Sequence, residues 1–247
     1  MQTMTICAGR DKSGTPEGFD RLTLHTGELY TIVGDTGSGK SRLIKDIEQL
    51  ADGDSITGRR VLLDGSHVDR MQRQKISAGL MAHLSQNMRF ILDTTVENFL
   101  ELHAKCRGKD ICVKDVLAVA NYITPEPVEP TQNLNLLSGG QTRALMIADI
   151  AMICDSPIVL IDEIENAGID KESTLKILCR QNKLVLVVTH DPHTALMSPL
   201  RIVMKNGAVQ GIVKRTPEEE KLFEELSLDY QLQRERQTLL RKGENLT

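Results

Sequence analysis

An eight-residue stretch in the first fifth of the chain constrains the fold more than any other feature. It reads Gly34-Asp35-Thr36-Gly37-Ser38-Gly39-Lys40-Ser41 and matches the pattern G-x-x-x-x-G-K-S. The β-prone run 29–33 precedes it, and apolar residues at helical spacing follow it from Leu43 to Ala51. Glycines let backbone N–H groups approach phosphates, and a helix N-terminus adds partial positive charge. The stretch therefore predicts a phosphate-binding loop, called the phosphate loop below, in an α/β protein.

Two side chains of the phosphate loop can act on a bound nucleotide. Lys40 can reach the β- and γ-phosphates. The Ser41 hydroxyl can ligate a Mg²⁺ ion that keeps much of its water shell. We expect each residue from Gly34 to Ser41 to contribute to nucleotide binding, with ATP and Mg²⁺ as the cofactors.

An acidic pair follows a second buried strand. The apolar run 158–161 ends at Asp162-Glu163, and the carboxyl ends of parallel strands are where α/β sheets place ligands. Asp162 is expected to hold Mg²⁺ through water, and Glu163 to position or deprotonate an attacking water. The alternative is a solvated Asp-Glu pair at the start of a loop, which the phosphate loop makes less favoured.

Two further polar residues follow strands expected in the same sheet. His190 comes after the apolar run 184–189, and Gln86 comes after the strand predicted over 79–84. A lone glutamine or histidine more often has a structural role than a functional one. Their positions at strand ends make His190 a candidate γ-phosphate contact, and we assign Gln86 to both catalysis and Mg²⁺ binding.

The sequence Leu137-Ser138-Gly139-Gly140-Gln141 opens another helix. That helix, predicted over 142–154, is apolar nearly all round and should be buried between layers. A helix N-terminus with N–H groups and a hydroxyl can bind an anion, although this one lies far along the sequence from the phosphate loop. Residues 93–137, with two predicted helices and a proline-rich stretch at 124–130, indicate an inserted helical subdomain. Thr95 is expected to cap the first of these two helices.

Composition limits the remaining possibilities. A net charge of −4 and a pI of about 5.9 argue against a broadly basic surface, so no nucleic-acid partner is expected. The longest apolar run, 184–188, is far shorter than a membrane span, and the first twelve residues lack an apolar signal core. We therefore expect a cytoplasmic protein with one domain over 1–213. A helical tail over 214–247, capped at Thr216, is expected to be solvated or packed on the domain edge, with partner binding as the alternative.

In this order, the motifs closely resemble those of the nucleotide-binding subunit of the ATP-binding-cassette (ABC) family. The phosphate loop resembles the Walker A motif, Gln86 the Q-loop, 137–141 the signature, 158–163 the Walker B motif, Asp170 the end of the D-loop, and His190 the switch histidine. Asp170 is also expected to cap the helix predicted over 171–180. The resemblance implies an α/β fold: a P-loop NTPase core with a mainly parallel sheet, an antiparallel β subdomain and an inserted helical subdomain.

The resemblance also implies a function. In this family, Mg²⁺-dependent hydrolysis of ATP to ADP and phosphate takes place between two head-to-tail subunits, in a homodimer or a heterodimer. Ser138, Gly139, Gly140 and Gln141 of one subunit would then face ATP held by the other. The conformational change usually drives an integral membrane permease, which would place the subunit on the inner face of the membrane.

Two departures from the family pattern leave a competing function open. The first 18 residues contain no aromatic side chain to stack on adenine, which leaves Arg10 as a substitute and predicts weak discrimination between ATP and GTP. The loop 164–170 lacks the usual proline and is one residue longer. This loop and the charged tail suggest, as an alternative, a soluble ABC ATPase that remodels or activates a protein complex rather than powering transport. A DNA-repair ABC ATPase is disfavoured because residues 93–136 are too short for a long coiled coil.

Overall fold

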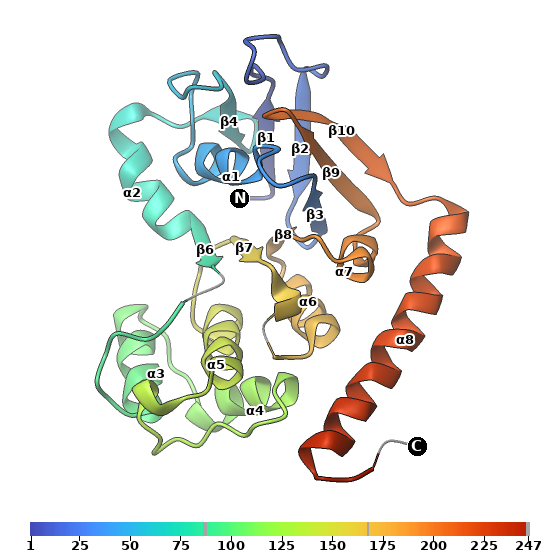
Figure 1. The fold of residues 1–247 in the computed structure, drawn as a ribbon. Coiled ribbons are helices and arrows are strands. Elements are labelled where there is room, and N and C mark those ends of the chain that lie inside the picture. Colours follow the sequence, from blue (N-terminus) through green and yellow to red (C-terminus); the bar gives the residue numbers. More distant parts are fainter. Residues whose placement is uncertain (86–87, 167, 246–247) are drawn as a thin grey trace.

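The computed structural model describes residues 1–85, 88–166 and 168–245, and these residues form two β-sheets. The larger sheet has six strands in the order β10-β9-β3-β8-β7-β6 (Figure 1). The five strands from β9 to β6 are parallel to one another, and the edge strand β10 pairs antiparallel with β9, as expected for a mainly parallel core. The strands span Leu29–Val33 (β3), Met81–Leu84 (β6), Ile158–Asp162 (β7), Leu184–Val188 (β8), Leu200–Lys205 (β9) and Ala208–Lys214 (β10).

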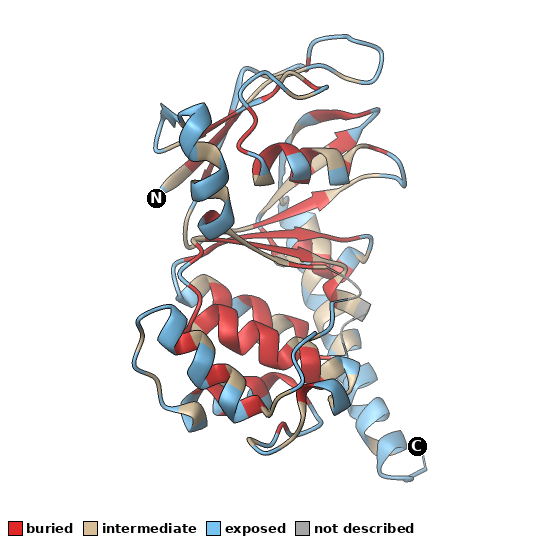
Figure 2. Cartoon of the chain, turned by 90° about the vertical axis from the view of Figure 1, so that its left-hand side faces the viewer, coloured by how far each residue is buried: buried red, intermediate tan, exposed pale blue. Residues whose placement is uncertain are grey.

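Alternate side chains of the central strands enter two separate cores. Val159 and Val185 point toward a cluster that includes the buried helix α5 (Gly139–Met152). Leu160 and Leu186 point the other way, toward α1 (Lys40–Glu48) and the smaller sheet. Figure 2 shows the buried residues concentrated in the sheet and in the helices against it. Burial on both faces explains why these strands are continuous apolar runs.

The smaller sheet is antiparallel, in the order β2-β1-β4-β5. Its strands span Thr3–Cys7 (β1), Arg21–His25 (β2), Arg60–Leu63 (β4) and Ser66–His67 (β5). The fully buried Arg59 ties this region to the core, since its guanidinium contacts Glu17 at 2.6 Å and Asp46, on α1, at 3.1 Å. The same side chain donates to the carbonyl of Gly207 at 2.7 Å. A buried arginine with two carboxylate partners and a carbonyl fixes the orientation of the β9–β10 turn.

The helical subdomain lies between β6 and α5 and contains α3 (Val96–Cys106), α4 (Val113–Ile123) and the 3₁₀ turn Leu134–Leu136 (Figure 1). Thr95 caps α3, accepting a hydrogen bond from the Asn98 amide at 3.3 Å, as predicted. The predicted start of β6 was wrong, because Gly79 and Leu80 end the helix α2 (Arg70–Leu80) and do not begin β6. Asp69 caps the start of α2 by accepting a hydrogen bond from the Met71 amide, and the helix continues to Leu80, whose side chain is buried in the core.

Three helices complete the chain: α6 (Lys171–Arg180), α7 (Pro192–Met197) and α8 (Pro217–Arg241). The predicted capping box at Thr216 starts α8, which is one 25-residue helix. None of its described residues is buried. His193 of α7 anchors it, because the ring stacks on Phe223 and its Nε2 lies 3.0 Å from the Ser227 hydroxyl. Within the described ranges, no helix has both the length and the apolar character to cross a bilayer.

Candidate active site

The phosphate loop leads from β3 to α1 and is locked against the β9–β10 turn. Gly34 and Gly39 have φ angles of 146° and 106°, in the region that favours glycine. A Cβ atom on Gly34 would lie 2.3 Å from the Met204 carbonyl oxygen, and one on Gly39 would lie 2.7 Å from the Gly207 Cα. The Gly207 amide also donates to the Ser38 carbonyl at 2.7 Å. Only glycine fits these two positions, so the loop has a fixed shape.

The Lys40 side chain folds back onto the phosphate loop. Its Nζ donates to the carbonyls of Gly34, at 2.6 Å, and Asp35, at 3.1 Å, and its side chain is buried. Burial lowers the pKa of the Lys40 amine, while the nearby charges of Asp35, Asp162 and Glu163 oppose that shift. A phosphate oxygen could replace the two neutral carbonyls and give this cation a charged partner.

The acidic pair stands at the end of β7. Asp162 pairs with Val188 of β8, and the Glu163 amide donates to the Val188 carbonyl at 3.0 Å. Glu163 has a φ angle of 49°, a left-handed conformation that is uncommon outside glycine. Such a conformation costs about 1–3 kcal/mol and is concentrated at functional sites. The turn at Glu163 leads into the 3₁₀ turn Ile164–Asn166.

His83 is a neighbour of Asp162 that sequence reasoning missed. It lies on β6, with its Nδ1 2.8 Å from Glu48 on α1 and its Nε2 3.8 Å from Asp162. The nearby Asp162 carboxylate raises the pKa of His83 above its ordinary value, and the charge of Glu48 acts in the same direction against the effect of burial. His83 therefore supports the Asp162 carboxylate from the side of the neighbouring strand.

One cavity of about 460 Å³, the phosphate-loop cavity, brings most of the predicted site together. The phosphate loop contributes Lys40 and Ser41, β7 and the following turn contribute Asp162 and Glu163, and the segment after β8 contributes His190. Gln86 lies outside the described residues. Lys12, which the sequence did not single out, also lines this cavity; the other lining residues are Thr36, Gly37, Gly39, Arg42 and Val188.

The signature turn, residues Ser138–Gln141, forms the N-terminus of α5. A capping box is present: the Ser138 hydroxyl accepts from the Gln141 amide at 3.2 Å, and the Gln141 side chain accepts from the Ser138 amide at 2.9 Å. The helix therefore begins at Gly139, three residues before its predicted start. Gln141 also donates to the Pro127 carbonyl at 2.7 Å, and the Ser138 hydroxyl donates to Glu126 at 2.5 Å. Among the described residues that line the phosphate-loop cavity, none comes from this turn.

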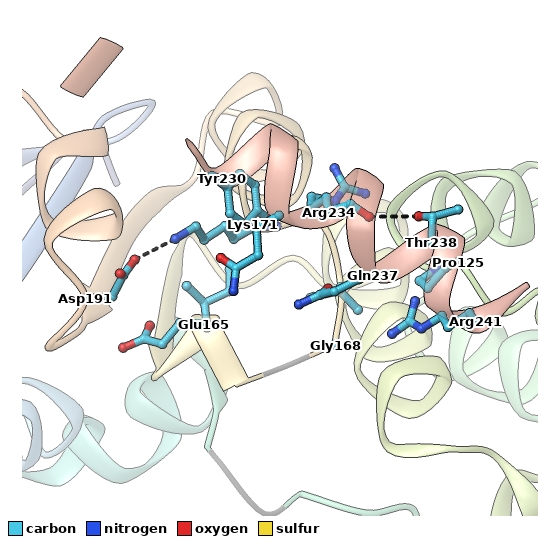
Figure 3. A pocket seen from close by; sticks show the side chains of 13 residues that line it. Pro125, Glu165, Gly168, Lys171, Asp191, Tyr230, Arg234, Gln237, Thr238 and Arg241 are labelled. Atoms are coloured by element: carbon cyan, nitrogen blue, oxygen red, sulfur yellow. Dashed lines mark hydrogen bonds and ion pairs between the residues drawn. The ribbon is translucent and has the colours of Figure 1, made fainter. Parts of the chain in front are cut away.

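The loop after Glu163 connects the acidic pair Asp162-Glu163 to helix α6. Glu165 accepts from the Thr189 hydroxyl at 2.9 Å, next to His190. Asp170 caps α6 as predicted and forms an ion pair with Arg234 of α8 at 2.7 Å. A second cavity of about 460 Å³ lies between this loop and α8, and Figure 3 shows Glu165, Lys171 and Arg234 around it.

Comparison with known proteins places this arrangement in a family. The model of the ABC transporter family matches residues 20–166, more than half of the chain. The chain belongs to the ABC transporter family. It is 49% identical to an uncharacterized ABC transporter ATP-binding protein of Methanocaldococcus jannaschii, over 92% of this chain and 88% of that protein.

Solved structures agree with the ABC fold. The cbiO1 protein of Clostridium perfringens, described as part of the ABC transporter complex cbiONQ, has a TM-score of 0.64 at 20% identity over 97% of this chain and 98% of that one. A dimeric bacterial ABC transporter cassette has a TM-score of 0.59 at 26% identity, over 85% and 98%. The expected α/β ABC fold is therefore confirmed.

Proposed function

We propose that this ABC protein binds and hydrolyses ATP with Mg²⁺ and uses the energy to change the conformation of a membrane partner. The observation that carries the proposal is the single cavity shared by Lys40, Ser41, Asp162, Glu163 and His190. These side chains come from three segments of the chain and supply a cation, oxygen ligands, a base and a further polar contact.

Each residue has a role that follows from its chemistry. Lys40 binds the β- and γ-phosphates, and Glu163 orients the attacking water and accepts its proton. The water oxygen bonds to the γ-phosphorus while the bond from that phosphorus to the bridging oxygen breaks, leaving ADP and phosphate. His190 contacts the γ-phosphate. Gln86 remains a proposed catalytic and Mg²⁺ contact.

The residues present fit a Mg²⁺ ion. The Ser41 hydroxyl and the Asp162 carboxylate line the same cavity and are the oxygen ligands that this ion prefers. The ion would supply positive charge that stabilises the phosphate oxygens in the transition state.

The complete site requires a second ABC subunit. The signature turn is a helix N-terminus able to bind an anion, yet its residues do not line the chain's own phosphate-loop cavity. In a head-to-tail dimer, Ser138, Gly139 and Gly140 of one subunit contact the γ-phosphate of ATP bound by the other, with Gln141 holding the turn in shape. The dimeric ABC cassette among the solved structures supports this arrangement.

An integral membrane permease is the proposed partner, which places the protein peripherally at the cytoplasmic face of a membrane. Support comes from membership of the ABC transporter family and from the similar cbiO1 protein, which is part of a transporter complex.

ATP hydrolysis with and without Mg²⁺ tests the enzymatic proposal. The parent protein should release phosphate only with Mg²⁺, and Glu163→Gln should bind ATP with parental affinity but hydrolyse it at least about a hundredfold more slowly, because it lacks the base. Hydrolysis by Glu163→Gln at the parental rate would exclude Glu163 as the base. Co-purification of a membrane protein encoded nearby tests the proposed partner.

A further inference from the structure

Lys12 brings a second cation to the nucleotide site from a distant part of the chain. It belongs to the loop between β1 and β2 and lines the phosphate-loop cavity together with Lys40. Its Nζ donates to the carbonyl of Gly37, in the middle of the phosphate loop, at 2.6 Å. The positive charge of Lys12 therefore lies at the rim of the cavity.

The loop that carries Lys12 is held in place by its own contacts. The Asp11 carboxylate accepts hydrogen bonds from the amides of Ser13 and Thr15, each at 2.8 Å. The Lys12 amide donates to the Asn206 carbonyl at 3.0 Å, and the Asn206 side chain donates to Asp11 at 3.2 Å. The β9–β10 turn, which also fixes the phosphate loop, thus fixes the position of Lys12.

The charge of Lys12 is not neutralised by the protein. Across the described ranges, its side chain forms no ion pair with a carboxylate, and its hydrogen-bond partner is the neutral Gly37 carbonyl. Lys171, by contrast, contacts the Asp191 carboxylate at 2.5 Å. Exchanging a neutral carbonyl for a phosphate oxygen replaces an ordinary hydrogen bond with a charge-assisted one, which is the stronger of the two.

The structure does not direct Arg10 to the nucleotide. Its guanidinium donates to the Gly14 carbonyl at 3.4 Å within its own loop, and Arg10 is not among the residues lining the cavity. The expectation that Arg10 could stack on adenine is therefore not supported by its position.

We propose that Lys12 is a second nucleotide-binding cation that contacts the phosphate chain of ATP and anchors it in the absence of an upstream aromatic residue. This assignment rests on the proposed function. Because the added contact is to phosphate, it contributes equally to ATP and GTP. The protein consequently recognises the triphosphate more strongly than the base.

Dissociation constants for ATP and GTP, measured by calorimetry on four variants of the full chain, test the assignment. Lys12→Ala should weaken the binding of both nucleotides about tenfold and leave their ratio unchanged, which corresponds to the loss of about one charge-assisted hydrogen bond. Lys12→Gln can still donate to Gly37 but has no charge, so it should bind as weakly as Lys12→Ala. Lys12→Arg should retain most of the affinity. Arg10→Ala, the matched control in the same loop, should bind as the parent does.

Three results would overturn the assignment. Parental affinity in Lys12→Ala would show that Lys12 does not bind nucleotide. Parental affinity in Lys12→Gln would show that Lys12 only holds the Gly37 carbonyl in place. A changed ratio of the ATP and GTP dissociation constants in Lys12→Ala would indicate a contact with the base. A parent protein that binds neither nucleotide would instead contradict the proposed function itself.

Discussion

The phosphate loop and the signature turn both form the N-terminus of a helix, but the two N-termini differ in their caps and in the charges beside them. Helix α1 begins at Lys40 after Gly39, which provides no side-chain cap, while α5 begins with a complete capping box from Ser138 and Gln141. Lys40 and Lys12 bring positive charge to the first end, whereas the Glu126 carboxylate accepts a hydrogen bond from Ser138 at the second. The first end is thus built to bind an anion within one chain, and the second holds a carboxylate of its own chain.

Because of this difference, we expect the two helix N-termini to have distinct roles in the proposed dimer. An uncapped helix N-terminus flanked by lysines attracts phosphates without a partner. In the proposed dimer, an incoming γ-phosphate would first have to replace the Glu126 carboxylate at the Ser138 hydroxyl. The comparison therefore predicts that changes in the phosphate loop remove nucleotide binding, while changes in the signature turn affect the step at which two subunits meet.

Lys40→Ala should have the largest effect. Without the cation that faces the phosphates, ATP affinity should fall at least about a hundredfold, and hydrolysis should fall with it. Calorimetry and phosphate release measure the two effects. Lys45→Ala, an exposed lysine on the same helix, is the matched control and should behave as the parent. Strong ATP binding by Lys40→Ala would place the nucleotide elsewhere.

Ser138→Arg should separate binding from hydrolysis. The long side chain blocks the signature turn, so hydrolysis should be abolished, while the affinity of the isolated subunit for ATP should stay within about twofold of the parent. Ser138→Ala controls for the lost cap, which is worth about 1 kcal/mol of stability. Thermal unfolding of both variants shows whether they remain folded. Loss of ATP binding in folded Ser138→Arg would contradict the separation of the two half-sites.

Glu126→Gln should have a smaller effect than the two changes above, and it should favour formation of the dimer. Removing the negative charge beside Ser138 should strengthen ATP-dependent dimerisation several-fold, because the γ-phosphate no longer approaches a carboxylate. The dimer dissociation constant can be measured by sedimentation in a Glu163→Gln background. Glu129→Gln, an exposed neighbour in the same segment, should leave that constant unchanged. Weaker dimerisation in Glu126→Gln would show that Glu126 supports the interface.

Local features of the molecule were predictable from the sequence, because neighbouring residues determine them. The strand β3, the helix cap at Thr95, the cap at Asp170 and the capping box at Thr216 all appear where the sequence placed them. The strand-end positions of Asp162 and His190 likewise follow from the apolar runs before them, and both residues line the same cavity.

Contacts between distant segments were not predictable. His83 meets Asp162 only because β6 and β7 are neighbours in the sheet, and nothing in the local pattern around His83 indicates it. Lys12 reaches Gly37 through a loop whose position depends on the β9–β10 turn. Glu126 lies in the proline-rich stretch, whose path back to Ser138 the sequence does not specify. In each of these cases, the tertiary fold rather than local propensity decides the contact.

Sedimentation of Glu163→Gln with ATP and Mg²⁺ tests the composite site most directly. Because this variant should bind ATP but hydrolyse it at least about a hundredfold more slowly than the parent, we expect a stable dimer with two nucleotides, and monomers when ADP replaces ATP. Adding Ser138→Arg to the same chain should return it to nucleotide-bound monomers. A Glu163→Gln protein that remains monomeric when saturated with ATP, or a double variant that still dimerises, would contradict an ATP site shared between two subunits.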